Sequence, residues 1–85
     1  MTLNPTLTTL DVLKVGQSAT VVHLAPQAQS GVDVQRRLME LGFVPGERIR
    51  MLKRGLPGGP VAVKVGESTF ALRKFEAALV SIQPE

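Results

Sequence analysis

The sequence of 85 residues contains no cysteine, no tryptophan and no tyrosine, and it has a single histidine, His23. Without cysteine the chain has no disulfides, no thiolate ligands for zinc or iron–sulfur clusters, and no cysteine nucleophile. Its only aromatic side chains are three phenylalanines. This is a poor supply for the stacking platforms of single-strand nucleic-acid binders, or for an aromatic groove that holds proline-rich peptides.

Long apolar runs are missing as well. No stretch approaches the roughly 20 apolar residues that span a bilayer. The first seven residues carry neither a basic leader nor an apolar segment, so we expect no signal peptide. A hydrophobic content of 44% and a charged content of 20% are typical of a globular domain. We therefore expect one soluble, cytoplasmic domain without membrane insertion.

The first half of the chain predicts one strand and one helix. Residues 1–8 lack periodicity and are interpreted as a flexible N-terminal tail, with the folded domain over 9–85. A short helical turn should follow, capped by Thr8 or Thr9, with leucines at 10 and 13 packing inward. Residues 18–24 are rich in β-branched side chains and predict a strand. A helix over 31–41 is predicted by the apolar stripe Val34, Leu38 and Leu41, with Ser30 and Asp33 as its capping residues.

After the helix, the apolar period changes from 3.6 residues to 2. Gly42 and Pro45 are expected to end the helix. Strands are predicted around 48–52, over 61–65, around 69–72 and over 79–82. A Gly/Pro-rich loop spans 55–60, Gly66-Glu67 suits a hairpin turn, and 75–78 reads as a helical turn. About five strands with one inserted helix, and a helical turn before the last strand, predict a mainly β, SH3-like barrel.

Two ordered motifs resemble a known family. Residues 36–46 read Arg-Arg-Leu-Met-Glu-Leu-Gly-Phe-Val-Pro-Gly, and residues 71–77 read Ala-Leu-Arg-Lys-Phe-Glu-Ala. Both are similar to the signature segments of FeoA, the small partner protein of the bacterial ferrous iron uptake system. The opening Leu10-x-x-Leu13-x-x-Gly16-Gln17 agrees with the same family, so the resemblance runs from about residue 9 to 83.

The resemblance implies an SH3-like fold, a role in ferrous iron uptake, and binding to the cytoplasmic part of the FeoB transporter, with an effect on its GTPase domain. The barrel also resembles the C-terminal domains of iron-dependent transcriptional repressors. One departure concerns the loop between the second and third strands, which commonly reads Pro-Leu-Gly-Asp-Pro in the family. Here Leu56 and Pro57 are exchanged, and Gly59 stands where the aspartate would be. We expect this glycine to make the loop more mobile.

Catalysis and metal binding find little support in the residues. The seven acidic side chains are scattered singly and His23 stands alone, whereas ferrous iron is usually held by clustered imidazoles and carboxylates. No nucleophile elbow, phosphate loop or dinucleotide fingerprint is present. We therefore expect no enzyme activity, no cofactor and no bound metal.

Nucleic-acid binding is the second hypothesis, together with an iron-regulator-like role. Small barrels often bind nucleic acid, and the net charge of +3 with a pI near 10.0 would favour an anionic partner. The basic residues, however, are spread along the chain, and aromatic residues are scarce. Protein–protein contact is the favoured hypothesis, so no nucleic-acid partner is expected.

The hypothesis of a docking protein needs an exposed surface. Arginine and methionine are enriched in interfaces, and apolar side chains on loops or outer strand faces are candidate anchors. The helix and the 55–60 loop are expected to form the partner surface together, although a solvated helix face is the favoured interpretation of the arginine pair. The helix or the N-terminal tail could equally cover Leu52 and Leu56. The oligomeric state stays open, because barrel edges can pair between copies. The candidate partner-binding residues are Arg36, Arg37, Met39, Glu40, Leu52, Leu56 and Pro57.

Overall fold

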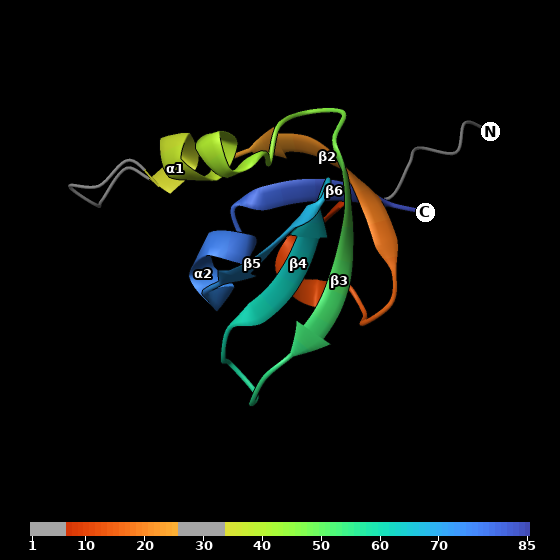
Figure 1. The fold of residues 1–85 in the computed structure, drawn as a ribbon, viewed down its shortest axis with the longest axis vertical. Coiled ribbons are helices and arrows are strands. Elements are labelled where there is room, and N and C mark those ends of the chain that lie inside the picture. The colour runs from red at the N-terminus through yellow and green to blue at the C-terminus, as the bar shows by residue number, and fades with distance from the viewer. Residues whose placement is uncertain (1–6, 26–33) are drawn as a thin grey trace.

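A computed structural model describes residues 7–25 and 34–85 of the chain. Its described part folds into one six-stranded sheet with two α-helices and one 3-10 turn (Figure 1). The elements in chain order are β1 (Thr8–Thr9), η1 (Leu10–Val12), β2 (Ser18–Leu24), α1 (Val34–Leu41), β3 (Arg48–Arg54), β4 (Val61–Val65), β5 (Ser68–Leu72), α2 (Lys74–Ala77) and β6 (Val80–Pro84).

The sheet has the strand order β1-β6-β2-β3-β4-β5, and every neighbouring pair is antiparallel. Its strands curve around a common interior, with β1 and β5 as the two edges (Figure 1). The predicted SH3-like, mainly β fold is confirmed, although no β1–β5 pairing closes the described sheet. The curvature buries one face of each strand, which a flat sheet of this size would leave open to water.

One strand of the sheet has no counterpart among the elements predicted from the sequence. Thr8, assigned to the tail, and Thr9, a candidate helix cap, instead form β1 and pair with Ile82 and Ser81 of β6. Two residues are too few to show a period of 2 in sequence, so only the pairing with β6 reveals this strand.

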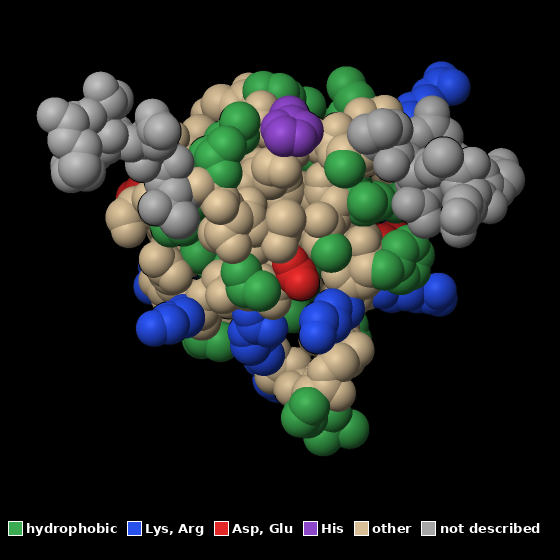
Figure 2. All heavy atoms as spheres, turned by 180° about the vertical axis from the view of Figure 1, so that it is seen from behind, with side chains coloured by type: hydrophobic (Ala, Val, Ile, Leu, Met, Phe, Trp, Pro, Cys, Tyr) green, Lys and Arg blue, Asp and Glu red, His purple; other side chains and the backbone are tan. Residues whose placement is uncertain are grey.

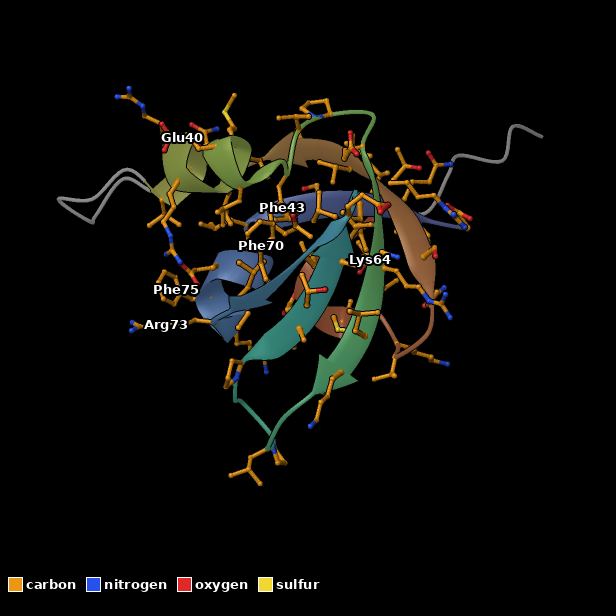
Figure 3. All side chains as sticks on the ribbon, in the orientation of Figure 1. Glu40, Phe43, Lys64, Phe70, Arg73 and Phe75 are labelled. Carbon is orange, nitrogen blue, oxygen red and sulfur yellow. The ribbon has the colours of Figure 1, made fainter. Side chains whose placement is uncertain are left out.

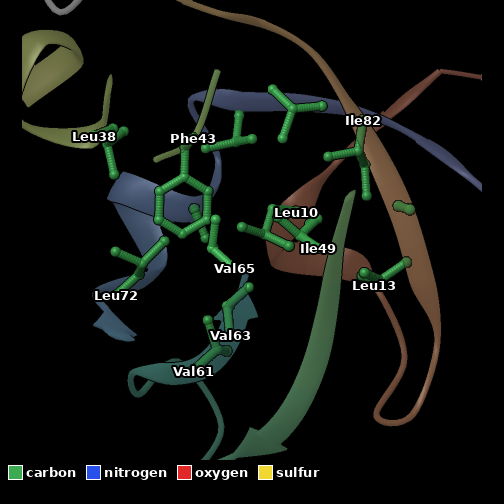
Figure 4. Close-up of a cluster of buried hydrophobic side chains, with 14 of the residues drawn as sticks. Leu10, Leu13, Leu38, Phe43, Ile49, Val61, Val63, Val65, Leu72 and Ile82 are labelled. Carbon is green, nitrogen blue, oxygen red and sulfur yellow. The ribbon is translucent and has the colours of Figure 1, made fainter. Parts of the chain in front are cut away.

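A single apolar core fills the interior (Figure 4). Alternate residues of β4 are buried, as the period of 2 predicted. Phe43 is fully buried, and its ring centroid lies 6.3 Å from that of the partly buried Phe70. Leu10, the first residue of η1, and Leu13, which follows its last residue, are both buried, which confirms the predicted inward packing. The largest fully buried side chains are Phe43, Leu10, Leu13, Leu38, Ile49, Met51, Leu72, Ile82, Val21, Val63 and Val80.

The helix α1 packs on the core through the predicted stripe. Val34 and Leu38 are buried, and Leu41 packs against them from the edge of the core. The Phe43 N–H donates to the Leu38 carbonyl at 3.0 Å, and the Gly42 N–H donates to the Met39 carbonyl at 3.0 Å. This is a Schellman ending, for which Gly42 supplies the required positive φ of 113°. The proposed caps at positions 30 and 33 lie outside the described residues.

The last two elements are shifted from their predicted positions. The helix α2 begins one residue earlier than the predicted turn at 75–78, and β6 runs to Pro84 rather than ending at residue 82. The strand continues because Gln83 and Pro84 pair with Thr20 and Ala19 of β2. No helix in the described part of the chain is both long and apolar enough to cross a membrane.

Candidate partner-binding surface

Three of the predicted site residues share the outer face of α1, which we call the helix surface: Arg36, Met39 and Glu40. The Arg36 Nε lies 3.6 Å from a Glu40 carboxylate oxygen, one helical turn apart, and both side chains are largely exposed. Met39 is 47% exposed. Glu40 lies on the outside of the helix, away from the sheet (Figure 3). An exposed ion pair of this kind contributes little to stability.

Arg37 has a different environment from its neighbour. Its guanidinium hydrogen-bonds the Glu76 carboxylate of α2, and the Glu76 side chain is only 3% exposed. The other Glu76 oxygen accepts a hydrogen bond of 2.8 Å from the Arg73 N–H at the start of α2. Arg37 was predicted to face away from the core as part of a docking or solvated face. The Arg37 side chain is 52% exposed, as predicted for the side away from the apolar stripe. It also ties α1 to α2, where it pairs with the only charged residue buried in the described part of the chain.

Glu76 was not identified as important from the sequence, although part of its role can be read there. An acid at the third position of a helix can accept from the backbone of the capping residue. The spacing from Arg73 to Glu76 has this form. Its pairing with Arg37, 39 residues away in sequence, has no local signal.

The loop between β3 and β4 displays the most exposed large apolar side chain. Leu56 is 83% exposed. The Gly59 N–H donates to the Leu56 carbonyl at 2.7 Å, and Gly58 between them has φ of +79°. With Pro57 before that glycine, residues 56–59 form a type II turn. Leu56 is therefore held at the tip of a defined turn.

Gly59 has a steric reason to be glycine. A Cβ at this position would lie 2.9 Å from the Leu56 carbonyl oxygen, closer than real contacts of that kind. From the sequence alone, this glycine is expected to make the loop more mobile. In the structure it instead permits the tight return of the loop, and an aspartate here would force the turn to shift.

Leu52 lies apart from both of these surfaces. It sits where the β3–β4 register shifts between Met51 and Lys53, as the extra residue of a β-bulge, and it is 38% exposed. It lines a shallow hollow of about 380 Å³ on the outer side of β3 and β4, together with Arg50 and Lys64. Lys64 points away from the core on this side (Figure 3).

The predicted partner surface is therefore not continuous. The helix α1 lies at one end of the molecule and the loop between β3 and β4 projects from the opposite end (Figure 1). The structure brings Leu56 and Pro57 together, and groups Arg36, Met39 and Glu40, but it does not join the two groups. The sequence separation between the two groups does not indicate how far apart they lie, because the distance between them depends on the curvature of β3.

Residues of β5 and α2 that are not among the predicted site residues lie beside the loop. Three adjoining hollows surround residues 55–60 and share lining residues with one another. The largest, about 510 Å³, is lined by Gly58, Pro60, Ala71, Arg73, Lys74 and Phe75. Phe75 is 48% exposed and, like Arg73, projects outward on the α2 side of the molecule (Figure 3). We call the largest hollow the loop groove.

The three hollows around the loop have a strongly one-sided charge. Four basic residues line the three hollows, and none of the described residues that line them is acidic: Lys53, Arg54, Arg73 and Lys74. Figure 2 shows basic side chains in a band just above the projecting apolar loop. Arg54 is held in place, since its guanidinium donates to the Asp11 and Leu13 carbonyls at 2.5 and 2.7 Å.

His23, the residue weighed as a metal ligand, is exposed on β2. Its Nε2 lies 3.4 Å from the Ser81 hydroxyl. Within residues 7–25 and 34–85, no three His, Asp or Glu side chains come together in a way that would hold a metal ion.

A comparison with known protein families places the chain. The model of the FeoA domain matches residues 8–84, nearly the whole of the sequence. The chain belongs to the FeoA family. A curated relative, an Fe(2+) transport protein A of Campylobacter jejuni, is 27% identical over 74 residues, which cover 87% of this chain and 95% of the relative.

Solved structures of FeoA proteins have the same fold. FeoA of Stenotrophomonas maltophilia is 40% identical, with a TM-score of 0.80 and 89% of each chain covered. It is described as an SH3 domain protein complexed with zinc, and as a candidate ferrous iron transport activating factor. FeoA of Chlorobium tepidum is 30% identical, with a TM-score of 0.77, covering 91% of this chain and 70% of that one.

The resemblance to metal-dependent repressors extends to the fold alone. A manganese-dependent transcriptional repressor is 21% identical with a TM-score of 0.78, and the match covers 98% of this FeoA-family chain but 44% of the repressor. The repressor therefore contains a domain of this shape within a longer protein.

Proposed function

We propose that this FeoA-family chain is a cytoplasmic, non-enzymatic accessory protein of bacterial ferrous iron uptake that binds the cytoplasmic part of the FeoB transporter. The observation that carries the proposal is the FeoA-domain match over residues 8–84. The relative at 40% identity, described as a candidate activating factor for ferrous iron transport, supports the same role.

The surface chemistry favours docking over catalysis. The described acidic residues do not gather around His23, and Glu76, the buried acid, is fully engaged by Arg37 and by the backbone of α2. By contrast, an apolar tip and a basic groove are exposed at one end. Exposed apolar side chains beside arginine are typical of binding sites.

Restoration of iron uptake tests the proposed role. In bacteria that lack their own FeoA, expression of this chain should restore uptake of radioactive ferrous iron. Cells that also lack FeoB should gain nothing from it. Restored uptake without FeoB, or no restoration by a chain that is expressed and folded, would contradict the proposal.

The helix surface and the loop tip are separate candidates for the contact, and single changes distinguish them. We propose that the loop tip carries it, so that Leu56→Asp should reduce co-purification with the cytoplasmic domain of FeoB. The charge reversal Arg36→Glu, on the helix surface, should leave capture close to that of the unchanged chain. A loss confined to Arg36→Glu would move the contact to α1. Arg37 is unsuitable for this comparison, because changing it also disturbs Glu76.

A further inference from the structure

One edge of the sheet offers unpaired backbone groups beside the loop groove. β5 pairs only with β4, so its other side has no strand neighbour in the described chain. We propose that this edge and the loop groove bind an extended acidic segment of a protein partner, which adds to the sheet as a strand next to β5. The inference rests on the proposed function only in taking the partner to be a protein.

The hairpin geometry identifies the free backbone groups. Val65 and Ser68 flank the two-residue turn between β4 and β5 and face each other in the register. In such a hairpin the flanking pair is hydrogen-bonded, and hydrogen-bonded pairs then alternate along the strands. By this alternation Thr69 and Ala71 direct their backbone N–H and C=O groups away from β4. Both residues are exposed.

A groove continues from the free edge. Ala71 belongs both to the edge and to the lining of the loop groove, where Pro60 and Phe75 supply apolar surface. The volume of the loop groove, about 510 Å³, lies within the usual range of ligand pockets. A strand laid along β5 would place an alternate side chain over this apolar surface, as in other cases of strand addition. We therefore expect an apolar residue in the bound segment.

The charge around the loop groove indicates which other residues the bound segment should carry. Lys53, Arg73 and Lys74 surround Ala71 and the groove, and the described residues give none of these three an ion pair or a side-chain hydrogen bond. No acidic side chain offsets them among the residues that line the groove. Complementary charge steers partners and sets specificity, so acidic residues should flank the apolar one.

Peptide titration tests the proposal directly. The probe is a synthetic peptide in which Glu alternates with Val on both sides of a central Leu. The peptide is long enough to span the five residues of β5. Added to the full-length, isotope-labelled chain, it should shift the NMR signals of the Thr69 and Ala71 amides and saturate. A version with Lys in place of Glu tests charge, and a version with alternate backbone nitrogens methylated tests strand pairing. Neither should bind measurably at concentrations that saturate the first.

Two charge-matched double variants locate the site. Arg73→Glu with Lys74→Glu should weaken binding of the peptide by about tenfold or more. Arg50→Glu with Lys64→Glu makes the same change in charge at a cross-strand pair on β3 and β4, away from the groove, and should change binding by less than about threefold. Both pairs are exposed, so both variants should fold, as their circular dichroism should show.

Several results would overturn the inference. Equal binding of the Glu and Lys peptides would reject the charge argument, and equal binding of the methylated peptide would reject strand addition. Shifts at Thr69 and Ala71 that grow with protein concentration alone would assign the edge to a second copy of this chain. Tighter binding of single-stranded RNA at the same residues, with a steep salt dependence, would assign the groove to nucleic acid.

The proposed function and the groove can fail separately. If the cytoplasmic domain of FeoB binds both double variants equally well, the groove is wrong and the proposed function stands. If the acidic peptide binds as expected while FeoB does not bind the chain at all, the groove stands and the choice of partner is wrong.

Discussion

The contact between Arg37 and Glu76 gives the sharpest prediction about stability. Removing the guanidinium by Arg37→Ala would leave the buried Glu76 carboxylate with one hydrogen bond, from the Arg73 N–H. An unsatisfied buried polar group costs about 1–3 kcal/mol. Because the Arg37 side chain is 52% exposed and water can replace part of the contact, we expect about 2 kcal/mol. The unfolding midpoint should then fall by roughly 8–16 °C.

The neighbouring residue provides a matched control. Arg36→Ala makes the same change on the same helix, but this side chain is largely exposed and its ion pair with Glu40 is a long one of 3.6 Å, so the change should cost less than about 0.5 kcal/mol. Denaturant unfolding measures the stability loss of both arginine variants. It is followed by far-ultraviolet circular dichroism because the chain has no tryptophan to report by fluorescence. A double-mutant cycle with Glu76→Ala should give a coupling of about 1–2 kcal/mol. Equal losses for the two arginine variants, or additive losses in the cycle, would refute the reasoning.

Two further predictions concern the helix ending and the end of the last strand. Gly42→Ala should destabilise the fold by about 1–2 kcal/mol, and by more than Gly16→Ala. Both glycines have positive φ, but only at position 42 would the new Cβ lie 3.1 Å from a Val65 methyl. Equal unfolding midpoints for the two variants would reject this steric argument. Hydrogen bonds from Arg48, which is 2.7 Å from the Glu85 carboxylate, lower the pKa of Glu85. The stability that this pairing adds to the folded chain is present above the unfolded-state pKa of the Glu85 carboxyl. It is lost as the pH falls through the lower folded-state pKa. An NMR titration should give a midpoint below the ordinary glutamate value, which Arg48→Ala should restore; an unchanged midpoint would contradict the pairing.

The regular elements could be predicted from the sequence because their signals are local. The alternation in residues 61–65 and the apolar stripe of Val34, Leu38 and Leu41 each repeat within a few residues, and both gave the correct element and the correct buried face. Gly42 marked the end of α1 for the same reason. Only the two-residue β1 carried no pattern of its own.

The candidate surface was harder to predict because it depends on contacts between distant segments. Arg37 and Arg36 are equivalent in the sequence pattern, yet one binds a buried acid on α2 and the other faces outward. Leu56 was identified because it stands on a loop rich in Gly and Pro. The basic hollows beside it were not predicted, since β3, β5 and α2 contribute their residues and meet only after the sheet has curved.

Titration of the purified chain into the purified cytoplasmic domain of FeoB, followed by calorimetry, tests the central claim most directly. If the chain works by docking, the titration should show saturable binding at a defined ratio, and Leu56→Asp should weaken it without lowering the unfolding midpoint. A flat titration with folded proteins, or binding that Leu56→Asp leaves unchanged, would contradict docking through the loop tip.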